Sequence, residues 1–233
     1  CSSDLVVADG MGGHVGGAEA SRVAADAFVA ALSNAGPGDA GPGDAGPTGT
    51  AAPSPVEERL AWALERANEA VADVVRARPE LGGMGTTLVG VRCGADGLHW
   101  ASVGDSPLWL WREGRLLRLN ADHSLAGVLR EEVVQGRRSP AKAADDAARH
   151  ILQAAVMGEP LAMRDVASHP LVAGDIVVLA SDGIETLPLG ELEALVAAHR
   201  HATADAIAHR ILEEIERRDE PGQDNATVVV AKR

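Results

Sequence analysis

The chain has 233 residues, of which 46% are hydrophobic, and this is enough apolar material for one sizeable domain. Its formal net charge of -13 opposes binding to phosphate backbones, so the sequence predicts no nucleic-acid partner. The two cysteines are too few for a disulfide framework, and the sequence shows neither a basic leader nor a long apolar span. We therefore expect a cytoplasmic protein without a membrane segment.

The first predicted element is a strand that ends in an acid. The apolar run at 5–8 leads directly into Asp9, and the glycine-rich stretch DGMGGHVGG then precedes a helix predicted at 18–33. Residues 36–55 read GPGDAGPGDAGPTGTAAPSP, which is too poor in apolar residues to offset the entropy of ordering. We expect a disordered loop at about 35–55. Ser54, Pro55 and Glu57 then predict a helix start with a capping box, and the helix ends near Pro79.

The middle of the chain changes to short apolar runs typical of strands, at 86–92, 97–104, 107–112 and 114–119. Trp109 and Trp111 alternate with two leucines, so both indoles are expected on one strand face. Helices are predicted at 123–135, 140–155, 190–199 and 203–217, and two more strands at 175–181 and 226–231. Because the strands form a meander with helices inserted between them, the pattern predicts an antiparallel α+β layered domain rather than βαβ units.

Four acids lie at the ends of predicted strands. Asp9, Asp105 and Asp182 each follow a strand, and Asp224 precedes the last one. Each alone could be a turn former or a helix cap. Burying unpaired carboxylates is costly, however, so a protein that gathers several at one place is expected to bind a cation there. Oxygen ligands without Cys or His favour Mg²⁺ or Mn²⁺ over zinc.

Six motifs resemble, in order, those of the bacterial metal-dependent serine/threonine protein phosphatases of type 2C. They are VADGMGGHVGGAEAS at 7–21, GMGTTLVGV at 83–91, VGDSPLWLW at 103–111, DHSL at 122–125, GDIVVLASDGIETL at 174–187 and GQDNATVVV at 222–230. The resemblance covers essentially the whole chain and implies one catalytic domain at 1–233. It also implies the fold, a central β-sandwich of two antiparallel sheets flanked by helical layers, α-β-β-α.

The resemblance implies a site with two Mn²⁺ or Mg²⁺ ions bridged by a water, which attacks the phosphate ester of a phosphorylated protein without a phosphoenzyme. The natural partners are then a phosphoprotein substrate and an opposing serine/threonine kinase. Asp9 is similar to the acid that bridges both ions, and Gly10 to the residue that offers its backbone carbonyl. Asp182 and Asp224 resemble the remaining ligands, and Asp105 resembles a ligand of a weaker third ion.

Five further residues have supporting assignments. Asn225 follows the last acid and is expected to orient it. Thr86 and Thr87 belong to the family's GTT motif beneath the site, although packing at a strand start would explain them equally well. His14 is a candidate proton donor, and a loop histidine bonded to the backbone is the alternative reading of both His14 and His123.

The chain departs from the family pattern in two places. The family has a phosphate-gripping Arg and an acid upstream of Asp9, where only CSSDLVVA stands here, so we expect a domain truncated at its N-terminus that lacks the first strand and turns over slowly. The usual GDSR is GDSP, with Pro107 in place of an Arg that would pair near Asp105.

Other functions fit parts of the pattern. The main alternative is a noncatalytic phosphatase-like module that binds a phosphoprotein and regulates it, and phosphate release stimulated by Mn²⁺ would distinguish the two. Dinucleotide binding lacks its third glycine, where Val15 stands. An esterase with Ser106 as nucleophile would need a downstream Asp and His pair, and the only D-x-x-H, Asp96 to His99, precedes it.

Overall fold

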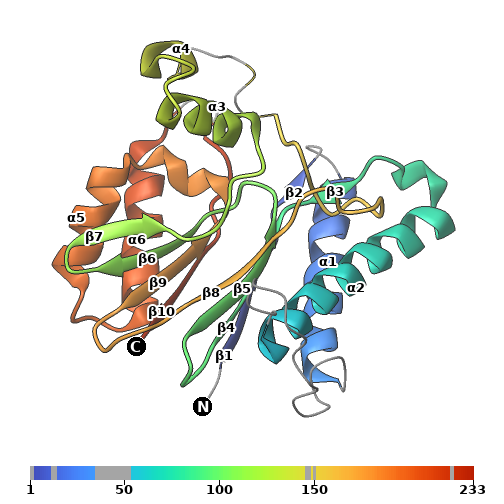
Figure 1. Ribbon diagram of the computed structural model, residues 1–233, viewed down its shortest axis with the longest axis horizontal. Coiled ribbons are helices and arrows are strands. Elements are labelled where there is room, and N and C mark those ends of the chain that lie inside the picture. Colours follow the sequence, from blue (N-terminus) through green and yellow to red (C-terminus); the bar gives the residue numbers. More distant parts are fainter. Residues whose placement is uncertain (1–2, 12–14, 35–53, 145–147, 149–150, 221–222) are drawn as a thin grey trace, which may run out of the picture.

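Two antiparallel β-sheets form the centre of the computed structural model, which describes residues 3–11, 15–34, 54–144, 148, 151–220 and 223–233 (Figure 1). The first sheet has the order β1-β4-β5-β8 and the second the order β10-β9-β6-β7. The strands of the first sheet are β1 (Ser3–Val7), β4 (Leu88–Cys93), β5 (Leu98–Val103) and β8 (Asp165–His169). Those of the second are β6 (Leu108–Arg112), β7 (Arg115–Arg118), β9 (Ile176–Ala180) and β10 (Val228–Lys232).

Helices cover the outer face of each sheet. In Figure 1, α1 (Val15–Ser33) and α2 (Pro55–Ala77) lie on the first sheet, and α5 (Leu189–His199) and α6 (Ala204–Arg218) lie on the second. The predicted α-β-β-α sandwich is therefore confirmed. Two shorter helices, α3 (Leu125–Val134) and α4 (Pro140–Ala144), project at one end. Within the described ranges, no helix combines the length and apolar content that crossing a bilayer requires.

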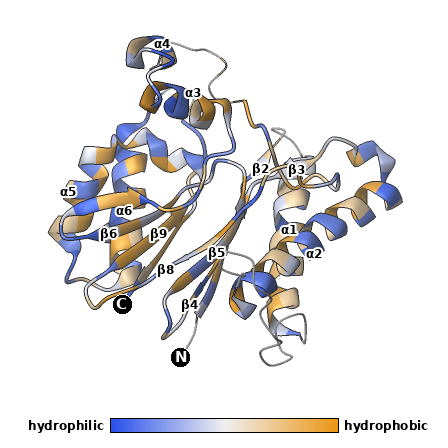
Figure 2. Cartoon of the chain, in the orientation of Figure 1, coloured by the Kyte–Doolittle hydropathy of each residue, from blue (hydrophilic) through white to orange (hydrophobic). Residues whose placement is uncertain are grey.

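Three apolar layers follow from the alternation of side chains along the strands. Leu108 and Leu110 pack between the two sheets, whereas Trp109 and Trp111 pack on the opposite face, among residues of α5 and α6. The prediction that both indoles share one face is confirmed. Figure 2 shows hydrophobic residues concentrated in strands such as β9, while the covering helices carry both colours.

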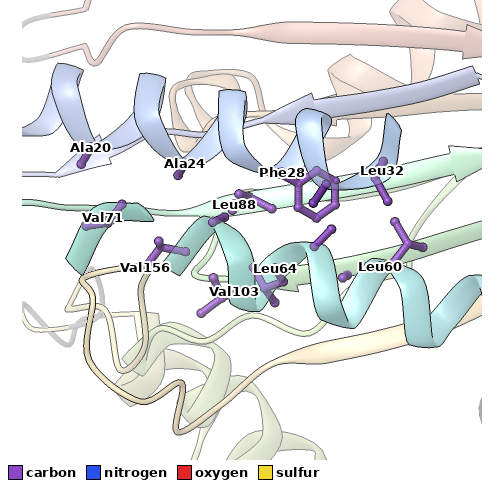
Figure 3. Close-up of a cluster of buried hydrophobic side chains, with 14 of the residues drawn as sticks. Ala20, Ala24, Phe28, Leu32, Leu60, Leu64, Val71, Leu88, Val103 and Val156 are labelled. Atoms are coloured by element: carbon purple, nitrogen blue, oxygen red, sulfur yellow. The ribbon is translucent and has the colours of Figure 1, made fainter. Parts of the chain in front are cut away.

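Glycine in β4 allows close packing against α1. A Cβ atom at Gly90 would lie 2.1 Å from Cζ of Phe28, whose side chain is fully buried. Figure 3 shows this ring between Leu88 of β4 and the leucines of α2. Burying a side chain of this size contributes about 1.5–3 kcal/mol to folding. The glycine therefore makes room for part of the apolar layer that lies between the first sheet and helices α1 and α2.

The predicted start of α2 is confirmed in detail. The Ser54 hydroxyl accepts a hydrogen bond from the Glu57 amide at 3.2 Å, and the Glu57 carboxylate accepts one from the Ser54 amide at 2.9 Å. This capping box satisfies two amides that the helix itself leaves unpaired. Of the loop expected at 35–55, residues 35–53 lie outside the described part of the chain.

The helix predicted at 140–155 is wrong in its C-terminal part. Helix α4 ends at Ala144, and residues from 151 onward bond to other segments. The Gln153 amide donates to the His123 carbonyl at 2.8 Å, and Val156 exchanges two backbone hydrogen bonds with Thr86. The sequence also failed to predict β8, which reads DVASH and pairs with β5. In both places contacts with distant segments outweigh the local pattern.

Candidate metal centre

The sheet topology brings all four strand-end acids to one end of the sandwich. Strands β1 and β5 both run antiparallel to β4, so Asp9 and Asp105 leave the first sheet at the same end. In the second sheet Ala180 of β9 pairs with Val228 of β10, so Asp182 follows β9 at the end where Asp224 precedes β10. This is the end of the sandwich opposite to the C-terminus in Figure 1, where β2 (Gly10–Met11) and β3 (Gly85–Thr86) lie.

The two threonines of the GTT sequence hold the backbone of Asp9. The Asp9 amide donates to Thr87 Oγ1 at 3.1 Å, and the Asp9 carbonyl accepts from Thr86 Oγ1 and from the Thr87 amide, each at 2.8 Å. Thr87 Oγ1 also lies 2.7 Å from Oγ of Ser106, which follows Asp105. The same buried hydroxyls thus connect the segments that carry Asp9 and Asp105.

Glycines allow the loop after Asp9 to approach the first turn of α1. A Cβ atom at Gly10 would lie 2.1 Å from the carbonyl oxygen of Gly17, and one at Gly17 would lie 2.7 Å from the carbonyl oxygen of Met11. Gly10 in turn pairs with Thr86 in the small β2-β3 sheet. Any side chain at Gly10 or Gly17 would separate these backbones, which accounts for part of the glycine-rich sequence.

The acids strongly influence one another. Burial raises the pKa of Asp9 to about 7, helped by the charge of Asp182 and a hydrogen bond with its carboxyl group, and then by the charges of Asp224 and Asp105. Burial also raises the pKa of Asp105 to about 6, with Asp182 as the next cause. Among the described residues, Asp182 Oδ1 finds no hydrogen-bond partner although it is buried. The cluster therefore has more negative charge than its surroundings neutralise.

Asp182 and Asp224 are linked through backbone contacts. Asp182 opens the 3-10 helix η2 (Asp182–Thr186), and a Cβ atom at Gly183 would lie 2.4 Å from the carbonyl oxygen of Asn225. The Ser181 hydroxyl donates to that same carbonyl at 3.2 Å. The backbone amide of Asn225 donates to Asp224 Oδ1 at 2.8 Å, so Asn225 orients the acid through its main chain. Asp224 itself is exposed.

Arg118 is a basic neighbour that sequence reasoning missed. Its Nη2 donates to the Asp105 carbonyl at 2.6 Å, and its Nη1 lies 3.4 Å from Asp122 and 4.0 Å from Glu185. It comes from β7, where it pairs with Trp109 of β6. The register of this hairpin therefore places Arg118 across from Trp109, two residues after Pro107, and this register is the signal that indicates its position.

The two candidate histidines have different outcomes. His14 lies outside the described residues. His123 is buried, its Nδ1 accepts a hydrogen bond from the Gly104 amide at 3.2 Å, and its own amide donates to the Gly104 carbonyl at 3.0 Å. Burial lowers the pKa of His123. Gly104 has a φ of 99°, in the region that favours glycine, so His123 stabilises the unusual turn before Asp105.

The arrangement fits a hard divalent cation in its chemistry, although it is not a preformed cage. In the described part of the chain, no three His, Cys, Asp or Glu side chains are arranged to hold a metal ion together. Carboxylate oxygens are the ligands that Mg²⁺ and Mn²⁺ prefer. The unpartnered oxygen of Asp182 is a carboxylate oxygen of this kind. The mutual repulsion of the acids opposes their closer approach in the absence of a cation.

A family model described as stage II sporulation protein E (SpoIIE) matches residues 3–233. The serine/threonine protein phosphatase PstP of Mycobacterium tuberculosis is 34% identical over 97% of this chain, which spans only 40% of the length of PstP. The serine/threonine phosphatase stp of Listeria monocytogenes is 29% identical over 98% of this chain and 84% of its own length.

Solved structures give the same relationship. The crystal structure of M. tuberculosis PstP matches 99% of this chain and 91% of its own, with a TM-score of 0.78 and 29% identity. The structure of the PstP catalytic domain in complex with two manganese ions matches 99% of this chain and 90% of its own, with a TM-score of 0.72 and 30% identity.

Proposed function

Since this chain belongs to the SpoIIE and type 2C family of bacterial serine/threonine protein phosphatases, we propose that it hydrolyses phosphoserine and phosphothreonine in proteins by means of a metal-activated water. The observation that carries the proposal is the half-buried pair of Asp9 and Asp182, with an unpartnered oxygen on Asp182. The PstP catalytic domain, which matches almost the whole chain, was solved in complex with two manganese ions, and this supports divalent ions in the present chain.

We propose that Asp9, Asp182, Asp224 and the carbonyl of Gly10 would hold two Mn²⁺ or Mg²⁺ ions, and that Asp105 would hold a weaker third. Ions bound there would act as Lewis acids and lower the pKa of a bound water, so that it can attack a phosphate ester near neutral pH. The carboxyl group of Asp9, whose pKa is raised to about 7 chiefly by burial, must lose its proton to act as a ligand. Thr86, Thr87 and Ser106 keep the Asp9 and Asp105 segments in place.

His14 remains the candidate that would protonate the leaving seryl or threonyl oxygen, and we expect His14→Ala to reduce turnover much less than loss of a ligand acid. A pH-rate profile that loses one limb in this variant would assign His14 a larger role. An opposing serine/threonine kinase and a cytoplasmic location are also part of the proposal. They are supported by the class of the relatives and by the low cysteine content.

The test is phosphate release from a phosphothreonine peptide in Mn²⁺ or Mg²⁺, repeated after chelation. We expect release with metal and none with chelator. Ser106→Ala separates the esterase alternative, because a nucleophilic serine would be indispensable whereas Ser106 is fully buried and bonded to Thr87. Activity that persists in chelator, or that depends on Ser106 and not on metal, would refute the proposal. Bound metal without any release would instead favour the noncatalytic regulatory module.

A further inference from the structure

A cavity of about 400 Å³ lies next to the acid cluster. Its apolar wall includes Trp109 of β6, Leu187, and Leu189 and Leu192 of α5. Leu187 and Leu192 are buried, whereas Leu189 is 51% exposed. Cavities of this size and lining are typical of sites that bind a small apolar group. An exposed leucine on the wall adds apolar surface that a bound group could remove from water.

The cavity and the acid cluster share structural elements. Arg118 lines the cavity and donates to the Asp105 carbonyl at 2.6 Å. Glu185 also lines it, and belongs to the same 3-10 helix that begins with Asp182. When a phosphorylated residue is bound at the acids, a residue a few positions away in the same peptide can therefore reach the cavity. An extended chain advances about 3.3 Å per residue.

The charged groups of the cavity already have partners. Arg118 lies 3.4 Å from Asp122 and 4.0 Å from Glu185, and Arg130 of α3 is paired with Asp122. Two cations thus face two acids, and the cavity offers little net charge to a ligand. An uncharged apolar side chain fits this lining better than a second phosphate or an acidic residue, each of which would have to displace Asp122 or Glu185.

We propose that this cavity binds an apolar side chain of the phosphorylated segment, such as Leu, Met or Phe, within a few residues of the phosphoresidue. The proposal rests on the proposed function and specifies its substrate class. The cavity then gives the site a preference for phosphopeptides that carry an apolar residue at one particular position. Apolar pockets discriminate between side chains by roughly 10- to 200-fold in kcat/KM, which sets the size of the expected preference.

The experiment compares phosphothreonine peptides that differ only by Leu or Ser at each position around the phosphoresidue, in Mn²⁺. At one position the wild-type protein should prefer Leu at least about 10-fold in kcat/KM. Leu189→Ser should reduce this preference several-fold and leave turnover of p-nitrophenyl phosphate unchanged, because that substrate has no neighbouring side chain. Leu117→Ser is the matched control, since Leu117 is 55% exposed on β7 and, by strand alternation, points away from the face that carries Arg118.

The outcomes separate this proposal from the proposed function. If the protein released no phosphate, the same peptides would be titrated calorimetrically, and tighter binding of one Leu peptide that Leu189→Ser weakens would still support the cavity. Equal kcat/KM and equal affinity for Leu and Ser peptides at every position would overturn it. A preference that Leu117→Ser reduces as much as Leu189→Ser, or that neither variant alters, would also overturn it.

Discussion

Arg118 donates a hydrogen bond from Nη2 to the backbone carbonyl of Asp105 at 2.6 Å, from a neighbouring strand of the sandwich. The adjoining backbone of β7 is bonded to β6, with the Leu119 amide donating to the Leu108 carbonyl at 2.8 Å. The positive charge also lowers the pKa of Asp105, against the larger effect of burial. A guanidinium thus stabilises the Asp105 turn although the neighbouring motif position is Pro107.

Replacing Arg118 tests this contact. We expect Arg118→Leu to weaken Mn²⁺ binding and lower kcat by roughly 10- to 100-fold, the range typical of groups that orient metal ligands. Arg118→Lys should recover part of the loss, because it restores the charge but not the geometry of the guanidinium. Arg115→Leu, an exposed position on the same strand, is the control. Calorimetric Mn²⁺ titration and steady-state kinetics measure these effects. Equal Mn²⁺ affinity and equal kcat in Arg118→Leu and Arg115→Leu would contradict the role of Arg118.

The pKa of Asp9 predicts a pH-dependent stability of the metal-free protein. In the folded chain this pKa is raised from 3.8 to about 7, so the folded state holds a proton that the unfolded state releases. In chelator, the stability that the bound proton gives the folded state is fully present below about pH 4 and is lost as the pH rises through about 7. Bound Mn²⁺ should abolish this loss, since it stabilises the deprotonated form.

Urea unfolding between pH 5 and 8 in chelator measures this effect. Buried His123, whose pKa is lowered by burial, has the opposite effect, because it makes the folded state less stable as the pH falls. The informative quantity is therefore the difference between wild type and Asp9→Asn, which removes only the carboxyl group. The account requires wild type to lose stability relative to Asp9→Asn as the pH rises; a constant difference would show that Asp9 does not hold a proton.

The hydroxyl pair beneath the site predicts an energetic coupling. Thr87→Val leaves the Asp9 amide and the Ser106 hydroxyl without their partner, which should cost about 1–3 kcal/mol of unfolding free energy. Combining it with Ser106→Ala should cost less than the sum of the single changes, by about 0.5–3 kcal/mol, because both remove the same contact. Thr227→Val, at an exposed position, is the control. Strict additivity in chemical denaturation would argue against the pair.

The close packing at Gly90 predicts that the apolar layer between the first sheet and helices α1 and α2 is sensitive to a small increase in side-chain volume. Gly90→Ala places a methyl group against the buried ring of Phe28 and should destabilise the fold by about 1–3 kcal/mol. Phe28→Leu in the same chain should recover part of this loss. Gly190→Ala, on helix α5 where a Cβ meets nothing within 4 Å among the described residues, should be neutral or stabilising. Thermal unfolding of wild type, Gly90→Ala, Gly90→Ala with Phe28→Leu, and Gly190→Ala checks the prediction. It fails if Gly90→Ala and Gly190→Ala have the same stability.

The proximity of the four candidate acids could be expected from the sequence, because each lies near the end of an apolar run, where a polar residue marks the end of a strand. The contact of Arg118 could not, because it depends on the register of β6 and β7 and not on any local pattern. Strand β8 offers only Val166 and Ala167 as adjacent apolar residues and acquires its structure by pairing with β5. The segment after α4 has a helical pattern, yet its backbone bonds to His123 and Thr86 instead.

The most direct test of the metal site is to measure Mn²⁺ affinity and phosphate release on the same samples of wild type, Asp182→Asn and Asp205→Asn. Asp205 is an exposed acid of α6, so its replacement removes the same charge away from the site. We predict Mn²⁺-dependent release by wild type and Asp205→Asn, and loss of both binding and release by about 100-fold or more in Asp182→Asn. Wild-type affinity and rate in Asp182→Asn would contradict the account.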